Sequence, residues 1–168
     1  MIRPRLILVL LYAVAIAQLA WYIPRMPPVL ATHYDSAGAP NGWMSRSFAL
    51  GFHLAMLGVT ALAFVGIPSL LGRLAPTLLN IPNREYWLAP ERRAASMGAL
   101  RNRMASLGCA TVVLMIVVTG LNFEANLAPP ARLSSTAVFS CIGGFLAFLV
   151  GWMISLYRRF GPPAAQRT

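Results

Sequence analysis

The chain has 168 residues, of which 58% are hydrophobic and 11% charged, and its formal net charge is +10. A soluble domain carries about 25% charged residues, so this composition excludes an ordinary soluble domain and favours the lipid bilayer as solvent. Every basic residue is an arginine, and the arginines cluster at the ends of apolar runs. That placement is typical of membrane orientation signals, and it argues against nucleic acid as a partner.

Four apolar runs have the length of about 17–25 residues that a helix needs to cross the hydrocarbon core. They cover residues 6–23, 48–71, 104–123 and 136–157. Because lipid offers the backbone no hydrogen-bond partners, helices are the economical structure for these runs. The first run exceeds the about 7–15 apolar residues of a signal peptide, so we expect a retained helix. We therefore predict an all-α integral membrane protein with four transmembrane helices in a single membrane domain, residues 1–168.

The arginines predict how the helices are oriented. Eleven of the fourteen lie at residues 1–5, 72–103 and 158–168, whereas Arg25, Arg46 and Arg132 lie in the other connecting segments. Because cytoplasmic segments carry the arginine excess, we expect both termini in the cytoplasm. The segment 24–47 is then an extracytoplasmic loop, and the segment 72–103 is a cytoplasmic loop.

The cytoplasmic loop is expected to end in a helix that begins near Pro90, since proline suits a first helical position, and that runs directly into the third span. One interpretation of the cytoplasmic loop is a docking surface for a cytoplasmic partner. Its candidate residues are Asn83, Tyr86, Trp87, Glu91, Arg92 and Arg93. The alternative is a solvated, orientation-setting face whose arginines meet anionic lipid headgroups.

Small residues recur at helical spacing in two of the spans. The rows are Gly51, Ala55, Gly58 and Ala61 in the second span, and Ser140, Gly144, Ala147, Gly151 and Ser155 in the fourth. Small side chains let helices approach closely in lipid, so we expect both rows in the bundle interior, with a dimer interface as the alternative. Cys109 and Cys141 are expected at different depths, too far apart for a disulfide.

Polar residues gather at the predicted outer end of the spans and in the outer loop. The binding candidates are Thr32, His33, Asp35, Gly38, Asn41, Trp43, Gln18, His53 and Glu124, and Asn122 and Asn126 lie nearby. Polar groups within spans are costly, which favours a function for them. One interpretation is a peptide or ligand pocket; another is a metal site of His33, His53 and a carboxylate; the third is interfacial residues satisfied by water and backbone. No closely spaced ligand motif supports a metal, and no cofactor or catalytic motif is present.

The outer loop has the composition of an ordered cap. Prolines at 24, 27 and 28 end the first helix because proline cannot continue one. Asp35 to Gly38 predicts a turn, and Pro40-Asn41-Gly42 predicts a second turn. If the segment before the first turn is extended, alternation places His33 and Asp35 on one side.

The loop motif Thr32-His33-Tyr34-Asp35, Gly38 and Pro40-Asn41-Gly42-Trp43 resembles the signature of a bacterial membrane domain of unknown function. That domain also forms the N-terminal part of SdpI-type immunity and signalling proteins. The run Asn80-Ile-Pro82-Asn83, followed by Tyr86-Trp87, resembles stand-alone members of the group. The resemblance covers about residues 1–127, and it implies a stand-alone form without the second membrane domain of SdpI-type proteins. It implies a multi-pass protein of the bacterial cytoplasmic (inner) membrane.

Together these features favour a non-catalytic binding or sensing module. Its expected partners are the bilayer, a peptide or protein at the extracytoplasmic face, and a larger membrane complex. The resemblance implies SdpI-like immunity or signalling less directly than it implies binding. Two alternatives remain: a small transporter or accessory transport subunit, and a membrane enzyme using His33 and Asp35.

Overall fold

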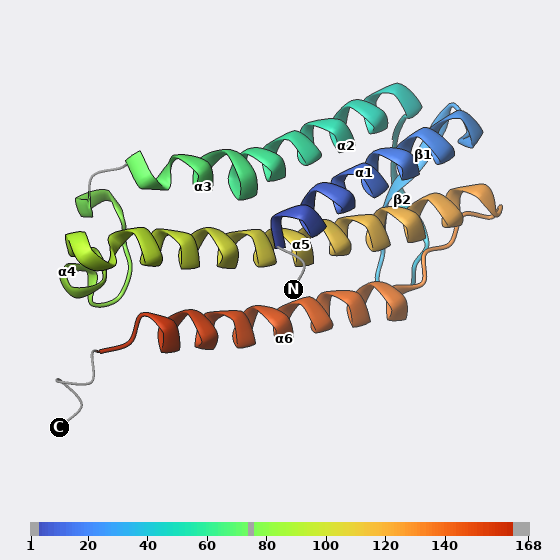
Figure 1. The fold of residues 1–168 in the computed structure, drawn as a ribbon. Helices are drawn as coiled ribbons and strands as arrows, with labels where there is room; N and C mark the ends of the chain where they lie inside the picture. Colours follow the sequence, from blue (N-terminus) through green and yellow to red (C-terminus); the bar gives the residue numbers. More distant parts are fainter. Residues whose placement is uncertain (1–3, 74–75, 163–168) are drawn as a thin grey trace.

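A computed structural model describes residues 4–73 and 76–162 (Figure 1). Four helical segments in it are long and apolar enough to cross a membrane. They are α1 (Pro4–Tyr22) with the 3₁₀ turn η1 (Ile23–Arg25), the run Arg46–Arg73, α5 (Pro90–Leu127) and α6 (Ser135–Arg159). The prediction of four helices with the length and composition of membrane spans is therefore confirmed, and these helices suggest a multi-pass membrane protein.

The second membrane segment is a helix with a local widening. It comprises α2 (Arg46–Ala61), the π-helical segment η2 (Leu62–Gly66), α3 (Ile67–Leu70) and the 3₁₀ turn η3 (Leu71–Arg73). The widening directly precedes Pro68, which cannot donate a backbone hydrogen bond and whose ring crowds the preceding turn. At the other end, the Ser45 hydroxyl caps α2 by accepting a hydrogen bond from the Phe48 amide at 3.3 Å.

Helix α5 is the central element of the bundle. It has 38 residues and begins at Pro90, so the predicted helical extension and the third span form one continuous helix. Helices α1, α3 and α6 all contact it, and Figure 1 shows it lying between the α2–α3 segment and α6. The two short elements η4 (Pro76–Leu78) and α4 (Arg84–Trp87) lie beside its first turns, at the end of the bundle where α6 finishes.

The loop between α1 and α2 is a β-hairpin at the opposite end of the bundle (Figure 1). Strands β1 (Val29–Tyr34) and β2 (Pro40–Ser45) pair antiparallel. The turn closes through hydrogen bonds from the Gly38 amide to the Asp35 carbonyl at 3.0 Å and from the Asp35 amide to the Ala39 carbonyl at 2.9 Å. The expected ordered cap with a turn at Asp35–Gly38 is thus confirmed.

The second predicted turn, at Pro40-Asn41-Gly42, is wrong, because these residues belong to β2. The glycine serves the strand pairing instead of a turn. The register shifts between Ala31 and His33, which leaves an extra residue in β1 opposite Gly42. A Cβ on Gly42 would lie 3.0 Å from the Cβ of His33, so glycine makes room for this bulge.

Two hydrophobic clusters stabilise the described part of the chain. The larger joins α1, α2, α5 and β1, and its fully buried members include Leu8, Leu30, Val112 and Phe123. The smaller lies at the α4 end, where six buried residues pack together: Leu71, Leu79, Ile81, Leu88, Met97 and Phe160. The bundle therefore has a separate core beyond the apolar part of its spans.

The prediction that both small-residue rows face the interior is wrong. A Cβ built on Gly51, Gly58, Gly144 or Gly151 would meet no atom within 4 Å. The close approach instead occurs at Gly108 of α5, where such a Cβ would lie 2.7 Å from the Cβ of Phe64. The spacing of small residues shows that they share one face of a helix, but it does not show which element packs against that face. In this bundle the outer helices pack on α5 instead. Cys109 and Cys141 are free, as expected.

Candidate functional site

One face of the hairpin packs on the helix bundle, and the other face is exposed. Leu30 is buried in the larger cluster, and Met44 packs against it. The side chains next to them in each strand point the opposite way, because successive residues in a strand alternate between faces. Val29 is 57% exposed and Trp43 is 60% exposed on that outer face. An aromatic ring is therefore displayed at the end of the bundle opposite α4.

Two asparagines at the end of α5 hold the outer edge of β1. The Ala31 amide donates to Asn126 Oδ1 at 2.8 Å, and Asn126 Nδ2 donates to the Ala31 carbonyl at 2.9 Å. Asn122 Nδ2 donates to the same carbonyl at 3.1 Å. Both amide groups also donate to the Tyr34 hydroxyl, at 3.2 Å from Asn122 and 3.1 Å from Asn126. We call Asn122, Asn126, Ala31 and Tyr34 the asparagine clamp.

The pairing of the strands determines which edge of the hairpin is open. The Arg46 amide donates to the Pro28 carbonyl at 2.9 Å, so the next hydrogen-bonded pair in this register is Leu30–Met44. The pair Ala31–Trp43 between them is not hydrogen-bonded, and both main chains face outward. The asparagine clamp occupies the Ala31 side. Among the described residues the sheet has two strands, so the Trp43 main chain lies along an open edge.

Asp35 and Gly38 have structural roles in the turn. Asp35 Oδ1 accepts hydrogen bonds from the Ala37 amide at 2.9 Å and the Ala39 amide at 2.8 Å. Gly38 has φ +78°, which glycine adopts without strain, and its carbonyl accepts from the Leu133 amide at 3.0 Å. A Cβ there would lie 2.1 Å from the Leu133 carbonyl oxygen. The turn is thus fastened to the α5–α6 connection, and β1 ends at Tyr34, so strand alternation does not extend to Asp35.

The polar site candidates at the hairpin end of the spans bond to the protein itself. Gln18 Nε2 donates to the Ile116 carbonyl at 2.9 Å, and His53 Nδ1 lies 2.7 Å from the Ala49 carbonyl oxygen one turn earlier. The Tyr22 hydroxyl donates to the Glu124 carboxylate. Gln18 and His53 line one cavity, whose volume is about 10 Å³. That volume suits about one water molecule and no larger ligand.

His33 lies on the hairpin surface, exposed, with its Nδ1 3.2 Å from the Thr32 hydroxyl. The exposed Asn41 is on β2, near the open edge. Across residues 4–73 and 76–162, no three His, Cys, Asp or Glu side chains are grouped as a metal ion requires. The structure thus brings Thr32 and His33 together but does not join them with His53 and a carboxylate.

The docking candidates at the α4 end divide into two groups. Asn83 Nδ2 donates to the Phe160 carbonyl at 2.8 Å, and Trp87 Nε1 donates to the Gly161 carbonyl at 3.1 Å, so both hold the end of α6. Arg92 stacks over the Tyr86 ring at 4.0 Å and donates from Nε to the Tyr86 carbonyl at 2.9 Å. These contacts give Asn83, Trp87, Tyr86 and Arg92 structural roles in the loop around α4.

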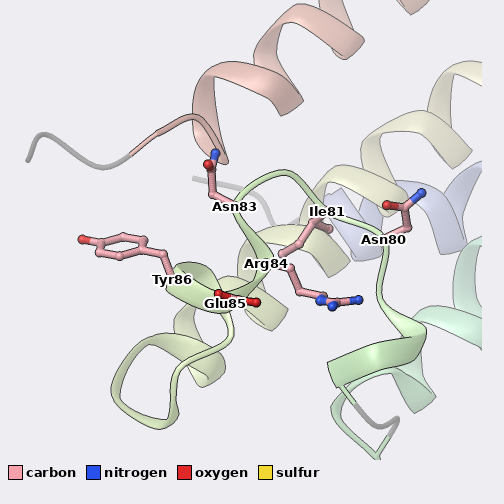
Figure 2. Close-up of a pocket in the computed structure, with 6 residues that line it drawn as sticks. All are labelled: Asn80, Ile81, Asn83, Arg84, Glu85 and Tyr86. Atoms are coloured by element: carbon pink, nitrogen blue, oxygen red, sulfur yellow. The ribbon is translucent and has the colours of Figure 1, made fainter. Parts of the chain in front are cut away.

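A cavity of about 330 Å³ lies over this loop. Its lining residues are Asn80, Ile81, Asn83, Arg84, Glu85 and Tyr86. Figure 2 shows Asn83 pointing to the end of α6, whereas Tyr86 and Asn80 point to opposite sides. Because these side chains diverge, the cavity does not gather them around one ligand. Glu91 is exposed and Arg93 half-buried on the first turn of α5, outside this cavity.

Comparison with known proteins matches only the part of the chain around the hairpin. Residues 7–58 match the model of an uncharacterised family, a domain of unknown function (DUF1648). The matched region contains most of α1, the whole hairpin and most of α2. Searches of the curated proteins and of the solved structures gave no match. The similarity therefore concerns the hairpin with its two flanking helices, and it carries no recorded activity.

Sequence reasoning did not select Tyr34, Asn122 or Asn126 as site residues, although all three belong to the clamp. The available signal was the i, i+4 spacing of Asn122 and Asn126, which places two amides on one face of α5. Both asparagines also lie at the same end of the bundle as the loop. The sequence shows that two asparagines are present at this end of the bundle. It does not show that both bond to the main chain of Ala31, because that requires the position of β1 to be known.

The Tyr34 phenol predicts a pH dependence of the hairpin. Burial raises its pKa above the ordinary value of 10.0, and the hydrogen bond from Asn126 partly opposes this. Because the folded-state pKa exceeds the unfolded one, this contribution to stability is complete below about pH 10 and is lost as pH rises through the folded value. We expect thermal stability to fall above about pH 10, and to fall less in Tyr34→Phe. Melting curves at several pH values, with the exposed Tyr157→Phe as control, test this; equal falls in both variants would contradict it.

Proposed function

We propose that this chain is a non-catalytic, membrane-anchored binding module, and that its hairpin captures an extended peptide segment along the open edge of β2. The observation that carries the proposal is the asymmetry of the hairpin. The outer edge of β1 is closed by the asparagine clamp, whereas the main chain of Trp43 on β2 faces away from β1, on the other edge of the hairpin. An unpaired edge is a template for a further strand, and an added peptide gains main-chain hydrogen bonds there.

The side chains at this edge support recognition of a peptide. The exposed Trp43 ring offers a large apolar surface, and Asn41 and the Thr32–His33 pair offer polar groups near it. The rear of the hairpin is fastened at three places: the clamp, the Gly38–Leu133 contact and the buried Leu30. A fastened edge loses little conformational entropy when it binds, which favours affinity.

The distribution of arginines supports an extracytoplasmic hairpin. Arg73, Arg84, Arg92, Arg93, Arg101, Arg103, Arg158 and Arg159 belong to the α4 end, whereas Arg25, Arg46 and Arg132 belong to the hairpin end. By the positive-inside tendency, the α4 end faces the cytoplasm of a bacterial cell and the hairpin faces outward. We further propose that the peptide is an extracytoplasmic signal or toxin, in keeping with the resemblance to SdpI-type proteins, and that the module acts within a larger membrane complex.

The test separates main-chain capture from simple contact with the tryptophan ring. Peptides are selected by display on the purified protein in nanodiscs, against empty nanodiscs, and their affinities are measured for Trp43→Ala and Trp43→Pro. Alanine keeps the outward N–H and proline removes it, while the hydrogen bonds to β1 are left intact in both. We expect the proline variant to bind about 10-fold more weakly than the alanine variant.

The matched control is Trp21→Ala, because Trp21 is 61% exposed but lies on α1. It should bind the selected peptides as the unaltered protein does. Hydrogen exchange at the Trp43 amide gives a second readout, since a paired peptide strand protects it. Failure to enrich any peptide, or equal affinities of the alanine and proline variants, would overturn the proposal.

A further inference from the structure

A groove at the α4 end combines two arginines with an apolar floor. Its volume is about 390 Å³, and it is lined by Gly72, Pro90, Arg93, Ala94, Met97 and Arg101. Arg93, Met97 and Arg101 are four residues apart along α5 and therefore share one face of the helix. Met97 is buried in the smaller cluster, so its position is fixed by the packing there. Two guanidinium groups thus flank a rigid apolar floor.

The opposite wall is the backbone at the end of the second membrane segment. Gly72 lies in η3, and a Cβ at this residue would be 3.7 Å from Nη1 of Arg101. A side chain here would narrow the groove beside the guanidinium group. The glycine therefore leaves room for a ligand next to Arg101.

The groove lies at the depth where the apolar part of the helices ends. The second candidate span finishes at Arg73, one residue after Gly72. On α5, Arg101 and Arg103 are the last charged residues before the uninterrupted apolar run. Ile67 and Leu70, on the segment that leads to Gly72, are half-exposed and face the surroundings of the bundle. A ligand with a polar head and an apolar tail fits this boundary.

The charge around the groove favours an anion. The α4 end carries eight arginines but only two acidic residues among the described part of the chain, Glu85 and Glu91. Guanidinium groups bind phosphate through paired hydrogen bonds, and basic pockets between membrane helices recognise anionic headgroups. Charge, depth and shape thus agree on one class of ligand.

We propose that this groove binds the phosphate of an anionic phospholipid between Arg93 and Arg101, with the acyl chains along the exposed residues of α3. The groove is separate from the hairpin edge, so this proposal does not depend on peptide binding there.

The test compares two double variants that remove the same charge. In Arg93→Gln/Arg101→Gln both arginines of the groove are neutralised. In Arg84→Gln/Arg158→Gln two exposed arginines of the same end, outside the groove, are neutralised. Retention of phosphatidylglycerol and of phosphatidylcholine is measured by native mass spectrometry after mixing with each lipid in detergent. We expect the groove variant to bind phosphatidylglycerol about 10-fold more weakly, with phosphatidylcholine unaffected and the control variant close to the unaltered protein.

Inorganic phosphate and glycerol phosphate form a separate arm, which distinguishes a lipid from a free phosphate. If either one raises the melting temperature as much as phosphatidylglycerol does, the commitment to a lipid is overturned. Equal loss of phosphatidylglycerol in the two double variants also overturns the proposal, because it would indicate general surface charge. Melting curves in phosphatidylcholine show whether both variants remain folded; if the groove variant is unfolded, Gly72→Leu, which fills the groove without altering charge, should reproduce the loss.

Discussion

Replacing Asn126 by leucine is expected to lower the free energy of unfolding by about 1–3 kcal/mol. Leucine keeps the approximate shape of the side chain but has no polar atoms. The Ala31 amide, in a residue that is 2% exposed, then loses the acceptor Asn126 Oδ1. Burying an unsatisfied donor costs more than a hydrogen bond gains, which makes this a large effect for one substitution.

The asparagine clamp also predicts where the effect will be found. In Asn122→Leu the Ala31 amide keeps its acceptor Asn126 Oδ1, and the Ala31 carbonyl keeps the hydrogen bond from Asn126 Nδ2, so this variant should cost less than Asn126→Leu. Hydrogen exchange at the Ala31 amide should become about 10-fold faster in Asn126→Leu. Thermal unfolding in detergent measures the global effect.

Asn102→Leu is the control for the clamp, because Asn102 is an exposed asparagine of the same helix. It should unfold as the unaltered protein does. If Asn126→Leu matches Asn102→Leu in both measurements, the clamp does not stabilise the hairpin, and the rigid edge on which peptide capture depends would lose its support.

The helices could be predicted from sequence because their cause is local. A run of apolar residues of sufficient length, ended by prolines or arginines, determines a membrane helix almost irrespective of its neighbours. Pro90 marked the start of α5 for a similar reason, since its missing N–H is harmless at a first helical position. These features need no knowledge of which element packs on which.

The hairpin and the packing depend on contacts between distant residues, and there prediction was incomplete. The turn at Gly38 was foreseeable, but the strands were not, because Gly42 reads as a turn residue until His33 is placed opposite it. The prediction for the small-residue rows was wrong for the same reason. Their spacing can be read from the local sequence, but the elements that pack beside them are distant in sequence.

The candidate site shows how polar residues near a membrane are used. Gln18, His53 and Asp35 were selected because a polar group near lipid needs a reason, and that reasoning is sound. The structure supplies the reason within the protein: each of them bonds to a main-chain group. Sequence composition counts the polar groups, but it does not reveal which main-chain atoms they bond to.

Phe160→Ala is expected to lower the free energy of unfolding by about 3–5 kcal/mol, the usual cost of emptying a buried phenylalanine site. Phe160 has an exposed fraction of 0% at the centre of the smaller cluster, and its ring meets that of Trp87 edge-on at 5.9 Å between centroids. Because its carbonyl accepts from Asn83, displacing it also releases the end of α6 from the α4 loop. The change is read from thermal unfolding and from tryptophan fluorescence.

The control for Phe160 is Tyr157→Ala, one turn earlier on α6, where the side chain is 60% exposed. Loss of the Tyr157 ring leaves no cavity in the core, so the free energy of unfolding should change by no more than about 0.5 kcal/mol. A large difference between the two variants means that the α4 end folds around Phe160 as a second core. In that case Met97, which shares this core and forms the floor of the arginine groove, is held in place by the end of α6. Equal stability of the two variants would instead mean that the α4 loop and the end of α6 do not stabilise each other.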